Sequence, residues 1–374
     1  MPSLRSLLGA SALGLFAASP LLADPIVITD IAGRQVEIDA PVQRVILGEG
    51  RQAFFTAVLE AENPFARVVG WRDDMLQADP DTYAAYQAVF PQIDEIPTFG
   101  GFKDGTFDVE QAVALQPDVM IMNLESMAAT NEAGYEQILA EVGIPIVYVD
   151  FRERPFENTL ASMEIIGELF GEEDRAAEFN AFFTEQMARV TDVIAAQSDL
   201  HRPLTFVERA GGYSEDCCMS FGAENFGQMV EVAGGTNMAT PFIPGTFGTV
   251  NAEQIIASDP EVVVVTGGNW EAYVPGGSWI GVGPGADLDV QRGKLATLME
   301  RPAFTGIRAV EDGNVHAIWH QFYNNPYSFV AVQRLATWLH PELFADLDPD
   351  ATLRELHERF LPIPYVPGYW VSLN

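Results

Sequence analysis

Cationic and aromatic residues follow nearly every strand that the sequence predicts. Lys and Arg number only 20 against 53 Asp and Glu, yet several of them stand directly after a strand. Open α/β sheets bind ligands beyond the carboxyl ends of their strands. Arg binds carboxylate or catecholate oxygens through bidentate hydrogen bonds, while Trp and Tyr add apolar walls and hydroxyl donors. The pattern therefore predicts a pocket for an anionic ligand, and its predicted ligand-binding residues are Arg51, Trp71, Arg72, Lys103, Arg209, Tyr213, Trp270, Tyr273, His320 and Tyr323.

Four further residues follow the same strands and belong to the wider candidate pocket. They are Gln52, Phe102, Glu125 and Arg152. Taken singly, any of these residues could be a surface cation or a core aromatic. We expect about half of the wider set to contact a ligand, because only the position after a strand selects them.

The histidines and cysteines do not predict a metal site formed by protein ligands. Receptors that hold Zn²⁺ directly need several His with carboxylates, and the chain has five His, three of them outside the strand-end loops. His316 and His320 bracket a strand and a loop, so their spacing carries no helical signature. Cys217 and Cys218 are adjacent; a ring between neighbours is strained, so two free thiols are favoured over a disulfide.

Catalytic motifs are missing from the sequence. It contains no G-x-S-x-G elbow, no P-loop, no H-E-x-x-H and no G-x-G-x-x-G after a strand. A nucleophile formed by Cys217 or Cys218 with His320 as base has no specific signature. An exported α/β enzyme is thus the remote alternative, and we expect a protein that is not an enzyme.

Short apolar runs alternate with helical patterns in both halves of the chain. Buried, β-branched strands that alternate with helices are typical of parallel sheets covered on both faces. The predicted strands are residues 44–47, 67–70, 119–122, 146–149, 204–207, 262–266 and 315–318. The predicted helices include residues 51–60, 109–115, 135–142, 226–233, 252–257 and 326–339. The fold class is therefore α/β, with two doubly wound lobes and mainly parallel sheets.

One long helix is predicted between the two halves. Residues 172–198 contain no Gly or Pro, and apolar residues recur in them at steps of three and four. A helix of this length spans roughly 40 Å, enough to reach from one lobe to the other. We therefore predict an N-terminal lobe at 24–171, a connecting helix at 172–198 and a C-terminal lobe at 199–374, although a core helix within one lobe is the alternative.

One stretch of the sequence occurs twice. GTFDVEQAVALQPDVMIM (105–122) and GTVNAEQIIASDPEVVVV (248–265) agree at seven of 18 positions without a gap. Asp108 and Asn251 are N-cap residues with Gln three places later, which predicts a capping box in each copy. Glu110 and Glu253 then lie in the first helical turn, where a carboxylate suits the helix dipole. A local role in the helix, or docking of both carboxylates onto one partner, would each explain this pair.

The N-terminus and the overall charge indicate an exported protein. One Arg, an apolar run from Leu7 to Ala18 and small residues up to Ala23 predict a signal peptide at 1–23, cleaved after Ala23. About 350 residues remain, enough for two domains. The net charge of −33 argues against nucleic acid or an anionic membrane as partner.

Several motifs in order resemble the substrate-binding proteins of ABC importers for ferric siderophores, haem and cobalamin, which have two lobes joined by one long helix. The matching motifs are PVQRVI (41–46), RVVGW (67–71), TFDVEQAVALQPDVMI (106–121), GIPIVYVD (143–150), IIGELFGEEDRAAEF (165–179), FGQMVEVAGGTNMA (226–239), VNAEQIIASDPEVVVVTGG (250–268), GNVHAI (313–318) and LHPELF (339–344). They cover about residues 26–345, and the tail LPIPYVPGYW (361–370) lies outside the resemblance.

The resemblance implies a location, a partner and a ligand class. It implies a periplasmic monomer that binds its ligand between the lobes, and it assigns Glu110 and Glu253 to contacts with Arg residues of an inner-membrane permease dimer. A ferric siderophore is favoured, since the chelator supplies the oxygen ligands of the iron and the protein needs no cofactor of its own. Anionic hydroxycarboxylate or catecholate types are favoured over neutral hydroxamates. Haem, cobalamin or an oxyanion such as molybdate are the alternatives.

Overall fold

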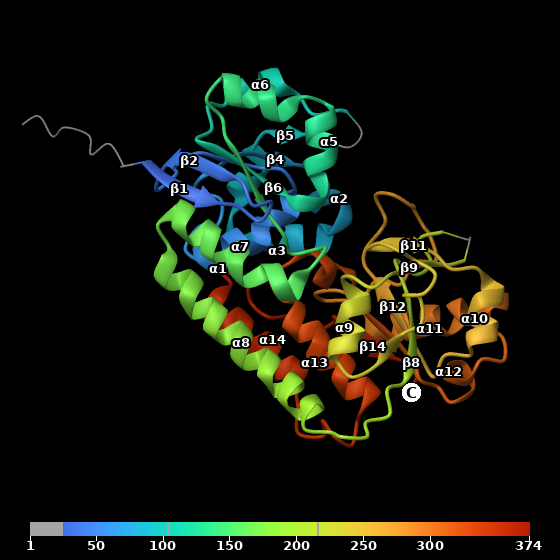
Figure 1. Cartoon of the computed structure of the whole chain (residues 1–374). Coiled ribbons are helices and arrows are strands. Elements are labelled where there is room, and N and C mark those ends of the chain that lie inside the picture. The colour runs from blue at the N-terminus through green and yellow to red at the C-terminus, as the bar shows by residue number, and fades with distance from the viewer. Residues whose placement is uncertain (1–24, 103–104, 215–216) are drawn as a thin grey trace, which may run out of the picture.

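The computed structural model describes residues 25–102, 105–214 and 217–374 (Figure 1). The predicted signal peptide and Lys103 lie outside these residues. The described part forms two α/β lobes, each built on its own sheet, and α8 runs along one side of both (Figure 1). None of the described helices is long and apolar enough to cross a membrane.

A five-stranded parallel sheet forms the first lobe, in the order β5-β4-β3-β6-β7. Its strands are β3 (Val45–Leu47), β4 (Val68–Arg72), β5 (Thr98–Phe99), β6 (Val119–Asn123) and β7 (Ile146–Val149). The chain order reverses between β3 and β6, and loops after strands diverge at such a point and leave a crevice. The helices of this lobe are α1 (Ala53–Leu59), α2 (Asp74–Ala78), α3 (Pro80–Val89), α4 (Val109–Ala114), α5 (Met127–Glu132), α6 (Tyr135–Glu141) and α7 (Pro155–Phe170).

The second sheet is mixed, with a parallel centre and antiparallel edges. Its order is β11-β9-β8-β12-β13-β14, with β10 beside β8. Its strands are β8 (Leu204–Glu208), β9 (Met219–Phe221), β10 (Thr236–Asn237), β11 (Phe247–Thr249), β12 (Val262–Gly267), β13 (Val315–Trp319) and β14 (Trp370–Ser372). The helices are α9 (Phe226–Val232), α10 (Ala252–Ser258), α11 (Leu288–Leu298), α12 (Arg308–Glu311), α13 (Ser328–Leu339) and α14 (Pro349–Phe360).

All seven predicted strands are present, with bounds that differ by at most two residues. The prediction of two lobes with mainly parallel sheets is confirmed. Short edge strands and the N-terminal hairpin of β1 (Pro25–Thr29) and β2 (Gln35–Asp39) were not predicted. The unmapped tail ends in β14, which pairs antiparallel with β13 and closes one edge of the second sheet.

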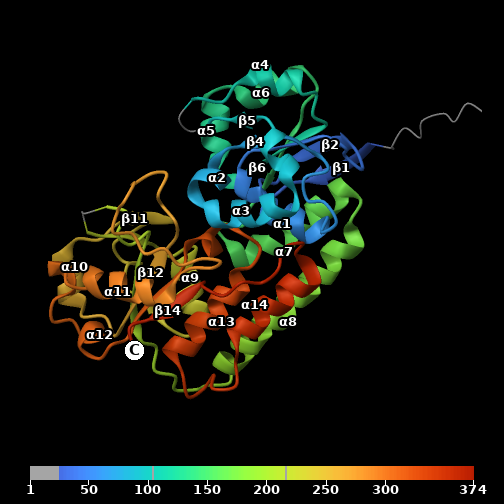
Figure 2. The same ribbon diagram turned by 180° about the vertical axis from the view of Figure 1, so that it is seen from behind.

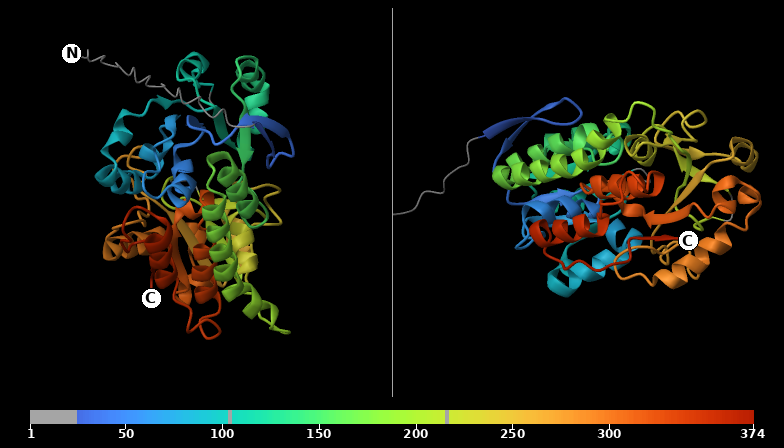
Figure 3. Two further views of the ribbon diagram at one scale, coloured as in Figure 1. Left: turned by 90° about the vertical axis from the view of Figure 1, so that its left-hand side faces the viewer. Right: turned by 90° about the horizontal axis from the view of Figure 1, so that it is seen from below.

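Helix α8 (Glu173–Ala195) packs against helices from both halves of the chain. Its 23 residues span about 35 Å. It contacts α7 and α1 of the first lobe and α13 of the second. Figure 3 shows the C-terminal helices (red) beside the green helix pair. One hydrophobic cluster contains buried residues of both lobes, so apolar packing along α8 holds the lobes together.

A phenylalanine cluster forms the centre of this packing. Phe329 of α13 contacts the rings of Phe182 and Phe183 of α8 edge-on, with ring centroids 5.5 and 5.4 Å apart. Phe179 adds a third contact at 6.5 Å. All four side chains are buried, and edge-to-face pairs are favourable beyond their buried area.

The two copies of the repeated unit start α4 and α10. Asp108 accepts a hydrogen bond from the Gln111 backbone N–H at 3.0 Å, and Asn251 accepts one from that of Gln254 at 2.8 Å. The Gln254 side-chain oxygen accepts a hydrogen bond from the Asn251 backbone N–H at 3.0 Å, which completes the predicted capping box. In the first copy the structure shows the Asp108 half alone. Both helices lie on the side of the molecule away from α8 (Figure 2).

Phe329→Ala should lower the free energy of unfolding by about 3–5 kcal/mol, because it leaves a cavity between α13 and α8. Urea denaturation followed by circular dichroism measures this loss. Val290→Ala, at a side chain that is 50% exposed, is the control and should change stability by less than about 0.5 kcal/mol. Equal small losses for both variants would contradict a shared core along α8.

Candidate ligand-binding site

A pocket of about 250 Å³ lies between the two lobes. The first lobe contributes Arg51 and Ala78, and the second lobe contributes the rest of the lining. Seven of the ten predicted ligand-binding residues line this pocket: Arg51, Arg209, Tyr213, Trp270, Tyr273, His320 and Tyr323. Most residues that were predicted because they follow a strand therefore lie together, as expected for ligand sites of open α/β sheets.

The loop after β3 places Arg51 at the pocket. Gly50 approaches the β4 end so closely that a Cβ there would lie 2.4 Å from the Arg72 carbonyl oxygen. Because of this close approach, Asp74 of α2 accepts two hydrogen bonds from the loop. Its Oδ1 accepts from the Gly50 backbone N–H at 2.6 Å, and its Oδ2 accepts from Arg51 Nε at 2.7 Å. Arg51 is thus held by an ion pair within its own lobe.

Glu49 and Arg152 form a second buried ion pair in the same lobe. Arg152 follows β7, and its Nη2 donates to both Glu49 carboxylate oxygens at 3.0 Å. Arg152 also pairs with Glu125, which follows β6. Glu49 further accepts from Arg51 Nη2 at 3.3 Å. Burial of such groups is tolerated because each charge has an opposite charge and hydrogen bonds beside it.

The loop after β13 reaches from the second lobe into this network. The Tyr323 hydroxyl contacts Arg51 and accepts from Arg152 Nη2 at 3.2 Å. Asn324 Nδ2 donates to Glu49 at 2.7 Å. Gln321 Nε2 donates to the Ala78 carbonyl at 2.7 Å. The lobes are thus joined at the pocket by hydrogen bonds as well as along α8.

Arg209, which follows β8, lacks a comparable partner. Within the described residues no carboxylate lies at ion-pair distance from it, and its Nε has no hydrogen-bond partner. Its guanidinium lies over the Phe247 ring at 4.7 Å, and its Nη1 is 3.7 Å from the Met219 sulfur. Burial and the nearby Arg152 and Arg51 lower the pKa of Arg209. An anion in the pocket would supply the missing counter-charge.

Aromatic side chains of the second lobe also line the pocket. The rings of Tyr213 and Trp270 meet edge-on at 6.0 Å, and Tyr273 is 6.2 Å from Tyr213. His320 lies 5.2 Å from the Trp270 ring, and its Nδ1 is 2.8 Å from the Thr266 hydroxyl. Burial and the three arginines lower the pKa of His320 well below its ordinary value. The imidazole is therefore neutral and adds no positive charge to the pocket.

Two of the predicted residues, Trp71 and Arg72, do not line this pocket. Trp71 is 2% exposed, and its ring packs against Phe65 at 5.5 Å in the core. Its position near the end of β4 selected it, but its side chain points into the lobe. Arg72 is half-buried and lines a separate hollow of about 190 Å³ with Trp71. Lys103 lies outside the described residues.

Among the wider candidates, Arg152 belongs to the network and Phe102 does not. Phe102 stacks on Phe107 at 4.2 Å within a small core of the first lobe. Gln52 donates to Asn123 at 3.0 Å beside the network. Three residues of the network were not predicted from the sequence: Glu49, Asp74 and Asn324. Glu49 and Asn324 stand in the same strand-end loops, so the rule would have found them if it had been applied to acids and amides.

The cysteine prediction was wrong. The structure joins Cys217 and Cys218 by a disulfide where two free thiols were favoured. Cys218 is buried and exchanges backbone hydrogen bonds with Val250, at 3.1 and 3.0 Å. Met219, the next residue, lines the pocket. No group of three or more His, Cys, Asp or Glu side chains could hold a metal ion in the part of the chain that the structure describes.

A buried carboxyl group lies next to the pocket lining. Asp79 is the residue after Ala78 and is 3% exposed, and its Oδ2 has no hydrogen-bond partner among the described residues. Burial raises the pKa of Asp79 from 3.8 to about 7, with a further contribution from the charge of Asp81. The folded protein therefore keeps a proton on Asp79 at pH values where the unfolded chain has lost it.

This pKa sets a pH dependence of stability. Between about pH 4 and pH 7 the Asp79 contribution to the free energy of unfolding should fall as pH rises, by up to about 1.4 kcal/mol per pH unit. Asp79→Asn keeps the shape and removes the proton equilibrium. Urea denaturation across this pH range should show wild type losing stability relative to Asp79→Asn. Parallel curves for the two proteins would contradict the raised pKa.

Comparison with known proteins identifies the fold. The sequence profile of the family described as periplasmic binding protein matches residues 76–320. The TroA-like periplasmic binding protein FepB from Veillonella parvula is 27% identical, with a TM-score of 0.84 over 94% of this chain and 100% of that chain. The comparison with curated proteins found no match.

Two more distant solved structures share the fold. The molybdate-binding protein MolA of Haemophilus influenzae is 21% identical, with a TM-score of 0.69 over 91% of this chain and 99% of its own. A periplasmic haem-binding protein from Pseudomonas aeruginosa is 18% identical, with a TM-score of 0.56 over 80% and 94%. The family and these neighbours are transport components and not enzymes. Because the profile matches well over half of the chain, the protein belongs to the periplasmic binding protein family, which confirms its resemblance to the ABC-importer class for ferric siderophores, haem and cobalamin.

Proposed function

We propose that the protein captures an anionic ferric siderophore between its lobes and delivers it to an ABC permease dimer in the inner membrane. The observation that carries this proposal is Arg209, a half-buried guanidinium in the pocket wall without a carboxylate partner among the described residues. Arg51 and Arg152 are already paired with Glu49, Asp74 and Glu125. The ligand therefore supplies the counter-charge of Arg209.

The rest of the pocket suits a chelate whose metal is already coordinated. A ferric siderophore surrounds its iron with oxygen ligands, so the protein needs to recognise only the outer surface of the complex. Tyr213, Trp270 and Tyr273 offer aromatic faces and hydroxyl donors for hydroxycarboxylate or catecholate groups. His320 stays neutral and can hydrogen-bond an oxygen without adding charge. The protein acts without a cofactor.

A compact oxyanion is the second candidate, favoured by the size of the pocket. Its volume of about 250 Å³ lies below the usual range of roughly 300–1,000 Å³ for pockets that enclose drug-sized ligands. The similar MolA protein was solved with molybdate bound. Haem is less well supported, because it would need His320 or one of the pocket tyrosines as an axial ligand.

Delivery rests on Glu110 and Glu253, which are exposed in the first turns of α4 and α10. As local helix contacts they would each add only about 0.3–1 kcal/mol. Placed at the same point of each lobe, they offer two equivalent carboxylates to the arginines of a two-fold symmetric permease. We infer that residues 1–23 direct export and that the mature protein works in the periplasm as a monomer.

Arg209→Gln should weaken binding of an anionic chelate by about tenfold or more, because one charge-assisted contact is worth about 1.5–3 kcal/mol. Calorimetric titration with iron(III) citrate, an iron(III) tris-catecholate, a neutral iron(III) hydroxamate and molybdate would measure this effect. Arg292→Gln, at an exposed arginine of α11, is the matched control. Tight binding of molybdate alone would favour the oxyanion, and a preference for the neutral hydroxamate would contradict the proposal.

Glu110→Ala combined with Glu253→Ala should leave calorimetric binding unchanged and abolish ligand uptake by cells. The reason is that both carboxylates are remote from the pocket lining and exposed. Glu173→Ala with Asp174→Ala, two exposed acids in the first turn of α8, removes the same charge and should leave uptake intact. Normal uptake by the Glu110 and Glu253 double variant would exclude the docking role.

A further inference from the structure

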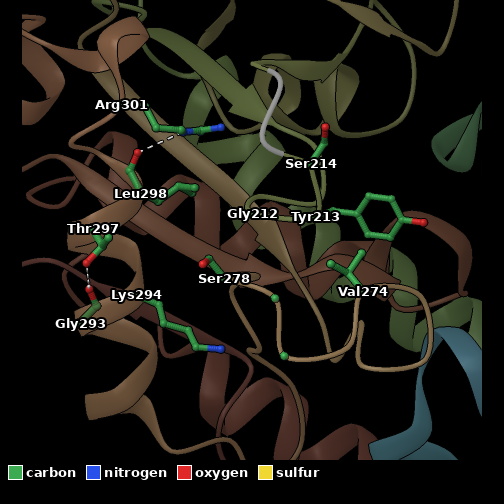
Figure 4. Close-up of a pocket in the computed structure, with 12 residues that line it drawn as sticks. Gly212, Tyr213, Ser214, Val274, Ser278, Gly293, Lys294, Thr297, Leu298 and Arg301 are labelled. Atoms are coloured by element: carbon green, nitrogen blue, oxygen red, sulfur yellow. Dashed lines mark hydrogen bonds between the residues drawn. The ribbon is translucent and has the colours of Figure 1, made fainter.

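A second, larger pocket opens in the second lobe next to the first. Its volume is about 850 Å³, and its walls come from the turn at Tyr213, the loop from Val274 to Ser278, and α11 with the residues after it. Tyr213 lines both pockets, and the loop continues from Tyr273 in one to Val274 in the other. Figure 4 shows Tyr213 and Val274 on one side of this space and Lys294 and Leu298 on the other. The two pockets therefore share one wall.

Gly293 is an unexpected residue in this wall. It is exposed in the middle of α11, where glycine is among the least favourable residues for a helix. A Cβ built at Gly293 meets no atom within 4 Å, so packing does not require glycine there. Because Gly293 lines the pocket, any side chain at this position would enter the open space. The sequence thus carries an unfavourable helix residue in the pocket wall, where packing does not require it.

Lys294 gives the pocket a cation that is available to a ligand. Its Nζ lies 4.3 Å from the centre of the Trp279 ring and donates to the Trp279 carbonyl at 3.1 Å. No carboxylate of the described residues lies at ion-pair distance from it, and burial lowers its pKa. Arg301 differs in having a carboxylate partner, since its Nη2 donates to Glu208 Oε1 at 2.6 Å, while its Nη1 has no hydrogen-bond partner among the described residues. An ammonium has three donors, so Lys294 retains capacity for an anion.

We propose that the second-lobe pocket receives an arm of the bound chelate, apolar along its length and ending in a carboxylate that pairs with Lys294. Val274 and Leu298 provide apolar walls, and Tyr213 also lines the pocket. This inference rests on the proposed function, because the metal centre of the same ligand lies at Arg209. It also resolves the mismatch between a chelate and a pocket of about 250 Å³, since the ligand then occupies both spaces.

The pocket can be tested without the chelate by using 4-phenylbutyrate, which has an apolar body and a carboxylate. By calorimetry we expect saturable binding to wild type with Kd on the order of 1 mM, as for a fragment of this size. Gly293→Leu should abolish it by filling the space, and Gly293→Ala should retain it. Lys294→Gln should weaken it about tenfold, while leaving the binding of 4-phenylbutanol, the uncharged analogue, unchanged.

The outcomes separate this inference from the proposed function. Leucine and alanine favour a helix more than glycine does, so both Gly293 variants should melt at or above the wild-type temperature. Arg209→Gln should bind 4-phenylbutyrate like wild type, because Arg209 does not line the second pocket. Unchanged binding in Gly293→Leu, or no saturation by about 10 mM in wild type, would overturn the second pocket. The titrations of Arg209→Gln with iron chelates test the proposed function independently of these results.

Discussion

The apolar packing along α8 is the constraint on which the site depends. One hydrophobic cluster runs from the first lobe through α8 to α13 and α14, so the two sheets are held at a fixed separation. At that separation, the loops that follow the strands of one lobe meet those of the other. Interiors packed in this way resist continuous deformation. We infer that ligand capture involves a small closure and local ordering of loops, not a wide hinge motion.

The fixed separation of the lobes also determines which charges at the pocket are paired. Arg51 and Arg152 are neutralised within the first lobe, and Tyr323 and Asn324 of the second lobe complete their hydrogen bonds. Arg209 arrives from the second lobe, where Glu208, the residue before it, is already committed to Arg301. Two arginines are thus paired within the protein, and Arg209 has no carboxylate partner among the described residues. Under the proposed function, Arg209 would select an anion by short-range contacts and not by the overall field of a chain with a net charge of −33.

Sequence patterns predicted the central strands of each sheet and the edge strand β7, but not the shorter strands toward the other edges. The strands β3, β6 and β12 each contain an uninterrupted apolar run, and burial on both faces makes such runs easy to recognise. Strands such as β9 and β14 have three residues each and are defined by their partners, which a local pattern does not contain. The tail beyond residue 361 is ordered because β14 pairs with β13.

The site residues were predicted because each of them follows a predicted strand. This criterion has a physical limit. It places a residue at the end of a strand, but it does not say toward which face the side chain points, so it selected Trp71, which is part of the core. It also favoured cations and therefore missed the carboxylates of Glu49 and Asp74, which decide which arginines are free. The partnership of Arg51 with Asp74 depends on the close approach of Gly50 to β4, a tertiary contact.

Native mass spectrometry of the protein purified from its own periplasm tests the central claim most directly. An anionic ferric siderophore between the lobes predicts an intact protein that carries one discrete adduct, with the isotope pattern of iron and a net negative charge once released. A protein that carries a neutral or cationic small molecule, or an iron-free adduct, would contradict the account.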